Sequence, residues 1–136
     1  MRLASLDKDY WELLSAEMHN AQYPETFVIP PIERRSSLKR GDAAKLMFMI
    51  ESVDEDGETV RFVERIFVIV AEILDDAYIG ILDDQPASIV VTDDTYLCFG
   101  AEVPFLPEHV TKIDRPPEKY VDWQLSQPPE RVWARE

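Results

Sequence analysis

The stretch that decides the fold runs from Glu64 to Thr92 and reads ERIFVIVAEILDDAYIGILDDQPASIVVT. Two aspartate-rich breaks divide it into three apolar runs, which are Arg65–Leu74, Ala77–Leu82 and Ala87–Thr92. β-Branched and aromatic side chains dominate the first run; they lose rotamer freedom in a helix but pack well on a pleated sheet. The pattern therefore predicts a three-stranded antiparallel meander at the centre of the protein.

Both faces of the first predicted strand are apolar. Alternation places Ile66, Val68 and Val70 on one face, and Phe67, Ile69, Ala71 and Ile73 on the other. Burial of each large aliphatic side chain contributes about 1.5–3 kcal/mol, so both faces must be covered. We expect an α+β, mainly β fold with an N-terminal amphipathic helix. Its sheet is a small antiparallel, partly open β-barrel or a strongly bent sheet of about five to seven strands.

Size and composition point to one domain without a cofactor. A chain of 136 residues has the length of a single domain. No apolar run approaches the length of a membrane span and no signal peptide is recognised, which favours a soluble, cytoplasmic protein. The single Cys98 excludes an internal disulfide and is expected to be a buried, inert thiol. The sequence contains no Gly-rich nucleotide loop, nucleophile elbow or zinc-binding His pair.

Negative charge is concentrated in the middle of the chain. Residues 42–108 carry sixteen carboxylates against Lys45, Arg61 and Arg65, a net of −13 that equals the net charge of the whole chain. A field of this sign repels the phosphate backbone, which argues against nucleic acid as a ligand. It favours a basic protein partner, or simply solubility.

The N-terminal segment, residues 1–22, is predicted to be helical. Asp7 or Asp9 is expected to cap an amphipathic helix that runs to about Asn20, because apolar residues recur there at spacings of three and four. Trp11 and His19 lie beside or at the edge of the apolar stripe. We interpret them as a rim aromatic and a solvated imidazole, with His19 as a weak catalytic candidate.

The β core is predicted to cover residues 23–113. The expected elements around the meander are an extended edge at Tyr23–Pro31, a solvated basic turn at Glu33–Arg40, a strand at Ala43–Ile50, a hairpin turn at Asp54–Glu58, a strand beginning at Tyr96, a short edge strand limited by Pro104, a helical turn at Pro107–Val110 and a last strand at Val110–Ile113. The Asp-Gly pair of the hairpin turn supplies the positive φ that such turns require.

Three aspartate pairs are the only constellation suited to metal chemistry. They are Asp75-Asp76, Asp83-Asp84 and Asp93-Asp94. Successive turns of a meander lie at opposite ends of the sheet, so the first and third pairs are expected to approach each other. Four such carboxylates are suited to a hard cation and, with His109, to a metal-assisted hydrolase. The alternative is that these aspartates are ordinary turn residues, and that His109 is structural.

The tail, residues 114–136, combines double prolines with aromatic residues. Pro116-Pro117 and Pro128-Pro129 rule out a long helix. Trp123 and Trp133 are unusual in a solvated linker, so the tail is expected to pack on the core or on a partner. A homodimer contact through these aromatics is a second possibility.

Four segments resemble the bacterial YegJ-like family of uncharacterised proteins. They are Gly41–Leu46, Glu64–Ile73, Tyr78–Pro86 and Gly100–Phe105, the last continuing into Pro107–Val110. The likeness covers roughly residues 23–113, and Ala101 departs from it where the family has an aspartate. It implies a partner-binding, immunity-like role and no catalytic mechanism. The candidate binding residues are Tyr78, Asp83, Asp84, Gln85 and Glu102, together with Trp11.

Overall fold

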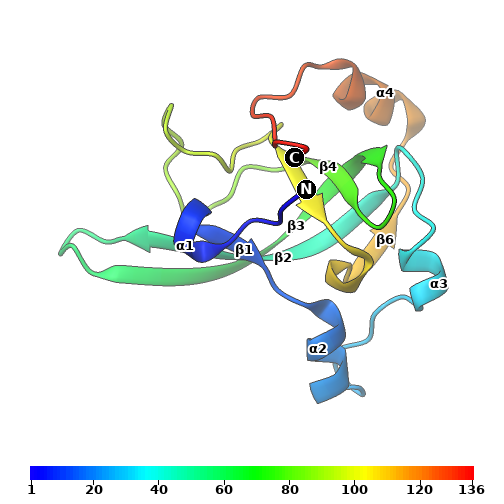
Figure 1. The fold of residues 1–136 in the computed structure, drawn as a ribbon, viewed down its shortest axis with the longest axis horizontal. Coiled ribbons are helices and arrows are strands. Elements are labelled where there is room, and N and C mark those ends of the chain that lie inside the picture. Colours follow the sequence, from blue (N-terminus) through cyan, green and yellow to red (C-terminus); the bar gives the residue numbers. More distant parts are fainter.

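The structure is a computed structural model that describes residues 1–136 (Figure 1). Along the chain the elements are α1 (Leu6–Asp9), β1 (Trp11–Leu13), α2 (Ala16–Gln22), α3 (Ile32–Arg35), β2 (Ala43–Val53), β3 (Thr59–Ile73), β4 (Tyr78–Leu82), β5 (Glu102–Phe105), the 3-10 turn η1 (Pro107–His109), β6 (Lys112–Asp114) and α4 (Glu118–Ser126).

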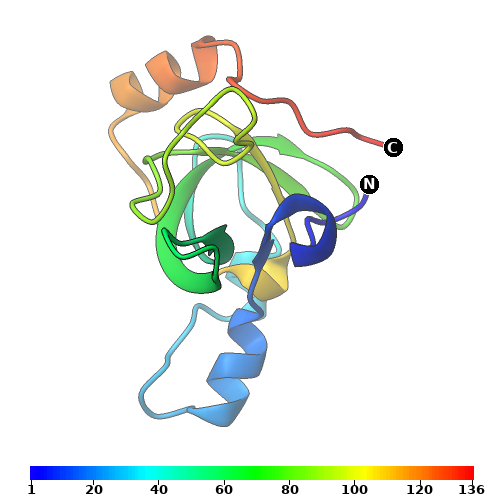
Figure 2. The ribbon, with the colours of Figure 1, turned by 90° about the vertical axis from the view of Figure 1, so that its left-hand side faces the viewer.

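The strands form one antiparallel sheet in the order β1-β2-β3-β4-β5, and β6 pairs with the start of β2. Figure 2 shows that this sheet curls into a half-barrel, with the short helices outside it. The expected fold class, a mainly β, strongly bent antiparallel sheet, is therefore confirmed. The helical turn before the last strand is confirmed as well, and that strand begins at Lys112.

The longest pairing joins β2 to β3 and projects as an arm at the left of Figure 1. Its register runs from Ala43 opposite Ile69 to Val53 opposite Thr59. At the tip, Oδ1 of Asp54 accepts hydrogen bonds from the backbone N–H groups of Asp56 and Glu58, each at 2.9 Å. The predicted hairpin turn is confirmed, with Gly57 at a φ of 81°.

The predicted third strand of the meander is wrong. Residues 87–92 form a loop, and the neighbour of β4 is β5. Two backbone N–H groups of the loop bond to a side chain instead of a neighbouring strand: those of Ala87 and Ser88 donate to the Glu64 carboxylate at 2.9 Å each. The strand expected from Tyr96 is also absent; only Glu102–Phe105 is extended and paired. Pro104 lies in this edge strand, as predicted.

The prediction of a single N-terminal helix is also wrong. Tyr10 adopts a left-handed φ of 64° and separates α1 from β1. Ser5 and Ser15 are the caps of the two short helices, whereas Asp9 instead binds Arg2. Continuing the helix would leave Trp11 at the surface, and burying this large aromatic ring is more favourable than adding helical turns.

Tyr23–Pro31 contains a turn and no strand, because the N–H of Phe27 bonds back to the carbonyl of Tyr23. The Glu33–Arg40 segment begins inside α3, and its Arg35 is buried rather than solvated.

The core fills the concave side of the sheet and includes both ends of the chain. Its largest cluster holds sixteen buried residues, among them Trp11 near the start and Trp133 near the end. A smaller cluster on the outer face joins Ala43 and Ile69 to Val121 of α4. The tail therefore contributes Trp133 to the larger cluster and Val121 to the smaller one.

Candidate functional site

The largest cleft lies at the end of the molecule that carries the hairpin arm. It has a volume of about 440 Å³ and is bounded by Asp9–Trp11, by Ile50–Val53 of β2, and by the loop segments 88–90 and 94–97. Eight of its fourteen lining residues are hydrophobic. In Figure 2, α1, the arm and this loop all lie toward the viewer, and residues beside or within these segments line the cleft.

Trp11 forms part of the cleft wall and is only 2 % exposed. Its ring stacks on Tyr96 at a centroid distance of 6.1 Å and meets the edge of Trp133 at 5.8 Å. Its indole Nε1 is the one buried side-chain nitrogen or oxygen of the chain without a hydrogen-bond partner. Trp11 is therefore a core residue that contributes to the cleft, which corrects its prediction as a rim aromatic.

The carboxylates around the cleft are of two kinds: some form ion pairs and others do not. Asp9 pairs with Arg2 at 2.7 Å, and hydrogen bonding from that guanidinium lowers the pKa of Asp9. Glu51 pairs with Arg61 at 3.1 Å. Exposed carboxylates without an ion pair stand beside them on the loop and at the hairpin tip; they are Asp93, Asp94, Asp54, Glu55, Asp56 and Glu58. This end of the molecule therefore carries a surplus of negative charge.

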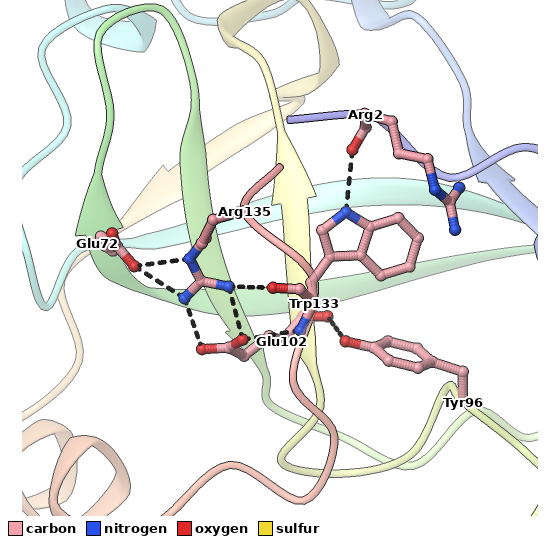
Figure 3. Close-up of polar contacts among 6 residues, drawn as sticks. All are labelled: Arg2, Glu72, Tyr96, Glu102, Trp133 and Arg135. Carbon is pink, nitrogen blue, oxygen red and sulfur yellow. Dashed lines mark hydrogen bonds and ion pairs between the residues drawn. The ribbon is translucent and has the colours of Figure 1, made fainter.

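Glu102 is the centre of a polar network that attaches the tail to the sheet (Figure 3). Its carboxylate accepts hydrogen bonds from Arg135 and from the backbone N–H of Trp133, each at 2.9 Å. Burial acts to raise the pKa of Glu102, but these hydrogen bonds outweigh it and the pKa is lowered. Arg135 also reaches Glu72 at 2.8 Å, and the Tyr96 hydroxyl donates to the Glu102 carbonyl at 2.6 Å.

The predicted binding residues do not form a common site. The Tyr120 hydroxyl donates to Asp83, and burial together with this bond raises the pKa of Tyr120 to about 12. The Tyr78 hydroxyl donates to the carbonyl of Arg35 at 3.0 Å and accepts from the N–H of Leu38 at 3.2 Å. These polar groups, like Glu102, hold the chain's own segments together.

Asp84 and Gln85 lie in the exposed turn after β4. Oδ1 of Asp84 accepts from the N–H of Gln85 at 2.8 Å, and Oε1 of Gln85 accepts from the N–H of Phe99 at 3.3 Å. Of the six predicted binding residues, Trp11 alone lines the cleft.

The aspartate pairs are not gathered. No group of three or more His, Cys, Asp or Glu side chains has an arrangement able to hold a metal ion. Asp75 and Asp76 lie in the turn between β3 and β4, whereas Asp94 lines the cleft. The prediction that the first and third aspartate pairs approach each other is wrong. The third strand, which would have brought the third pair back to the same end of the sheet as the first, does not form.

The remaining reactive groups are buried, except His19, which is half-buried. His109 is buried and its Nδ1 accepts from the N–H of Leu106 at 2.9 Å, and burial lowers its pKa. The ring of His19 packs against Phe27. Cys98 is buried as predicted, and burial raises the pKa of its thiol.

Arg35 was missed by the sequence interpretation. Its buried guanidinium donates to the carbonyls of Pro30 and Pro107, at 2.7 and 2.9 Å, and to Glu17 at 2.6 Å. In the sequence it lies within a run of basic residues that suggests only a solvated turn.

No family model, curated protein or solved structure matches the chain. None of its helices combines the length and the apolar character needed to cross a membrane.

Proposed function

We propose that this chain is a non-catalytic protein-binding module, immunity-like in role, that docks a basic protein partner through the end bearing the hairpin arm. The observation that carries the proposal is the group of unpaired, exposed carboxylates around the cleft. At the tip, Glu55, Asp56 and Glu58 make no side-chain contact with a cation. Opposite charge on a partner would steer its approach and fix its orientation.

Ion pairing inside the chain strengthens this argument. Several carboxylates of the central region form ion pairs with flanking arginines: Asp42 with Arg115, and Glu72 and Glu102 with the single guanidinium of Arg135. The hairpin tip and Asp94 have no such partner. The end of the molecule that carries the hairpin arm therefore has a high density of unpaired negative charge, which another molecule can contact.

The metal-assisted hydrolase receives no support from the geometry, since its four carboxylates are separated. We further propose that the chain is a member of the YegJ-like family and is located in the cytoplasm. Its single thiol, Cys98, fits a reducing compartment. Trp133 is buried in its own domain, so Trp123, which is half exposed, is the tail aromatic available for a homodimer contact.

Charge-neutralising variants test the docking surface. The probe is a decalysine peptide, titrated calorimetrically against the full chain. E55Q/D56N/E58Q removes three carboxylates at the hairpin tip without disturbing Asp54, which holds the turn. D75N/D76N/D122N is the matched control, because it removes three exposed carboxylates elsewhere.

At about 100 mM salt we expect the tip variant to weaken binding by about fivefold or more and the control by about twofold or less, because screening at that ionic strength limits the reach of exposed charges to about 10 Å. Raising the salt from about 20 to about 200 mM should weaken binding of the wild-type chain strongly. Equal effects of the two variants, or an affinity indifferent to salt, would reject the docking surface.

A further inference from the structure

We propose that the cleft beside Trp11 takes an extended segment of the basic partner, with an apolar side chain inserted in the cleft. This inference rests on the proposed function and specifies its site. It concerns the apolar part of recognition, which the surface carboxylates alone do not supply.

The shape and lining of the cleft suit a peptide side chain. Its volume of about 440 Å³ lies within the range of about 300–1,000 Å³ that is usual for ligand pockets. Ile50, Ile89 and Leu97 contribute apolar surface. Val53 and Val90 stand at its border and are largely exposed. Exposed aliphatic groups beside an apolar cleft favour binding of a partner, because the partner removes their surface from water.

Trp11 and Tyr96 supply aromatic surface to the same cleft, with their rings stacked at a centroid distance of 6.1 Å. The indole Nε1 of Trp11 is buried in the core, so the ring offers a ligand an apolar surface.

The charges around the cleft select the side chains that flank the inserted residue. Asp94 lines the cleft and has no ion pair, and the tip carboxylates follow directly after Val53, which also lines the cleft. Asp9 and Glu51 keep their own arginines. An acidic segment would be repelled, whereas lysine or arginine flanking the inserted residue would be attracted.

Two short blocked peptides test the inference. One alternates lysine with leucine, and the other alternates lysine with serine and has the same charge. Each is titrated into the full ¹⁵N-labelled chain, and the indole N–H signals of Trp11, Trp123 and Trp133 are followed by NMR. W123F assists their assignment, because it removes the exposed indole.

We expect the lysine–leucine peptide to bind at least about tenfold more tightly, since burial of one leucine side chain is worth about that factor. The Trp11 indole signal should shift, because a side chain inserted in the cleft changes the surroundings of the Trp11 ring. The Trp133 indole, already bonded to the carbonyl of Arg2 at 2.9 Å, should change little.

Substitution of exposed valines avoids the core. V53S/V90S alters the cleft border, and V28S/V132S removes two exposed valines that do not line the cleft. The first variant should lose about fivefold of the affinity for the lysine–leucine peptide, and the second should lose little. Neither should change binding of the lysine–serine peptide.

The outcomes separate this inference from the function it rests on. If both peptides bind equally and the Trp11 signal stays in place, the cleft is not the site, although acidic docking survives. An effect of V53S/V90S no larger than that of V28S/V132S would also overturn the inference. If neither these peptides nor decalysine bind, the proposed function itself fails.

Discussion

The backbone N–H of Trp133 donates to Oε1 of Glu102 at 2.9 Å, although the two residues are 31 positions apart in the chain. Beside this bond, the N–H of Glu102 donates to the carbonyl of Arg131 at 2.9 Å, and Ala101 forms an isolated parallel bridge with Arg131. The C-terminal segment therefore pairs with the chain where β5 begins, and it places the Trp133 ring against Trp11 and Tyr96.

Replacing Glu102 by glutamine should weaken the attachment of the tail. Glutamine keeps an acceptor for the Trp133 N–H but loses the ion pair with Arg135, so we expect the free energy of unfolding to fall by about 1–3 kcal/mol. E72Q is the control, because the pair of Glu72 with Arg135 is much more exposed and should contribute about 1 kcal/mol or less. Urea denaturation at neutral pH measures both, and equal losses would contradict the central role of Glu102.

The same carboxyl should make stability depend on acid. Because hydrogen bonds hold the folded pKa of Glu102 below its ordinary value of 4.5, its stabilisation is present above that value and is lost as the pH falls through the folded pKa. Urea denaturation between about pH 6 and pH 3 should show a steeper loss for the wild type than for E102Q. E102Q should retain some acid sensitivity, because the pKa values of Asp9 and Glu64 are lowered too.

Arg35→Lys should destabilise the fold although it keeps the charge. The guanidinium bridges the carbonyls of Pro30 and Pro107, and a single ammonium cannot reproduce that planar geometry. We expect a loss of about 1–3 kcal/mol in the free energy of unfolding, because these partly buried carbonyls lose their donor. R34K, at an exposed neighbour, should change stability by about 0.5 kcal/mol or less. Similar values for the two variants would show that the buried contacts contribute little.

Gly80 allows β3 and β4 to approach closely. A Cβ atom at this position would lie 2.5 Å from Cγ2 of Val68 and 3.2 Å from Cε1 of Phe105. G80A should therefore lower the free energy of unfolding by about 1–3 kcal/mol through overpacking. In a double-mutant cycle, V68A should relieve part of that strain, so the double variant is expected to be at least about 1 kcal/mol more stable than the sum of the single effects. Additive effects would argue against this contact.

The sequence predicted the elements in which local pattern and burial agree. β3 and β4 have apolar character on both faces, and the Asp-Gly turn of the arm is a strong hairpin signal, so all three were predictable. The apolar run at 87–92 has the same local character, yet it forms a loop because the Glu64 carboxylate satisfies its first N–H groups. That competition depends on a side chain 23 residues away, which local pattern does not reveal.

The candidate site was only partly predictable. The acidic hairpin tip is evident from composition, whereas the cleft requires the N-terminal segment to break at Tyr10. Helical spacing at positions 10, 13, 14 and 18 predicted continuity there. Trp11 was singled out but placed at the surface, because its three aromatic neighbours come from β2, the 94–97 loop and the tail.

Tyr10 itself provides the last prediction. Its φ of 64° is unfavourable for a residue with a Cβ atom by about 1–2 kcal/mol. The side chain is mostly exposed, so Y10G should raise the free energy of unfolding, by about 0.5–1 kcal/mol after the added backbone entropy of glycine. Y10V should lower it, because β-branched residues tolerate this region worst. Y23G, at an exposed tyrosine with an ordinary φ of −131°, should lower stability by about 0.5–1 kcal/mol. If Y10G and Y23G shift thermal denaturation in the same direction, the left-handed turn before β1 is not strained.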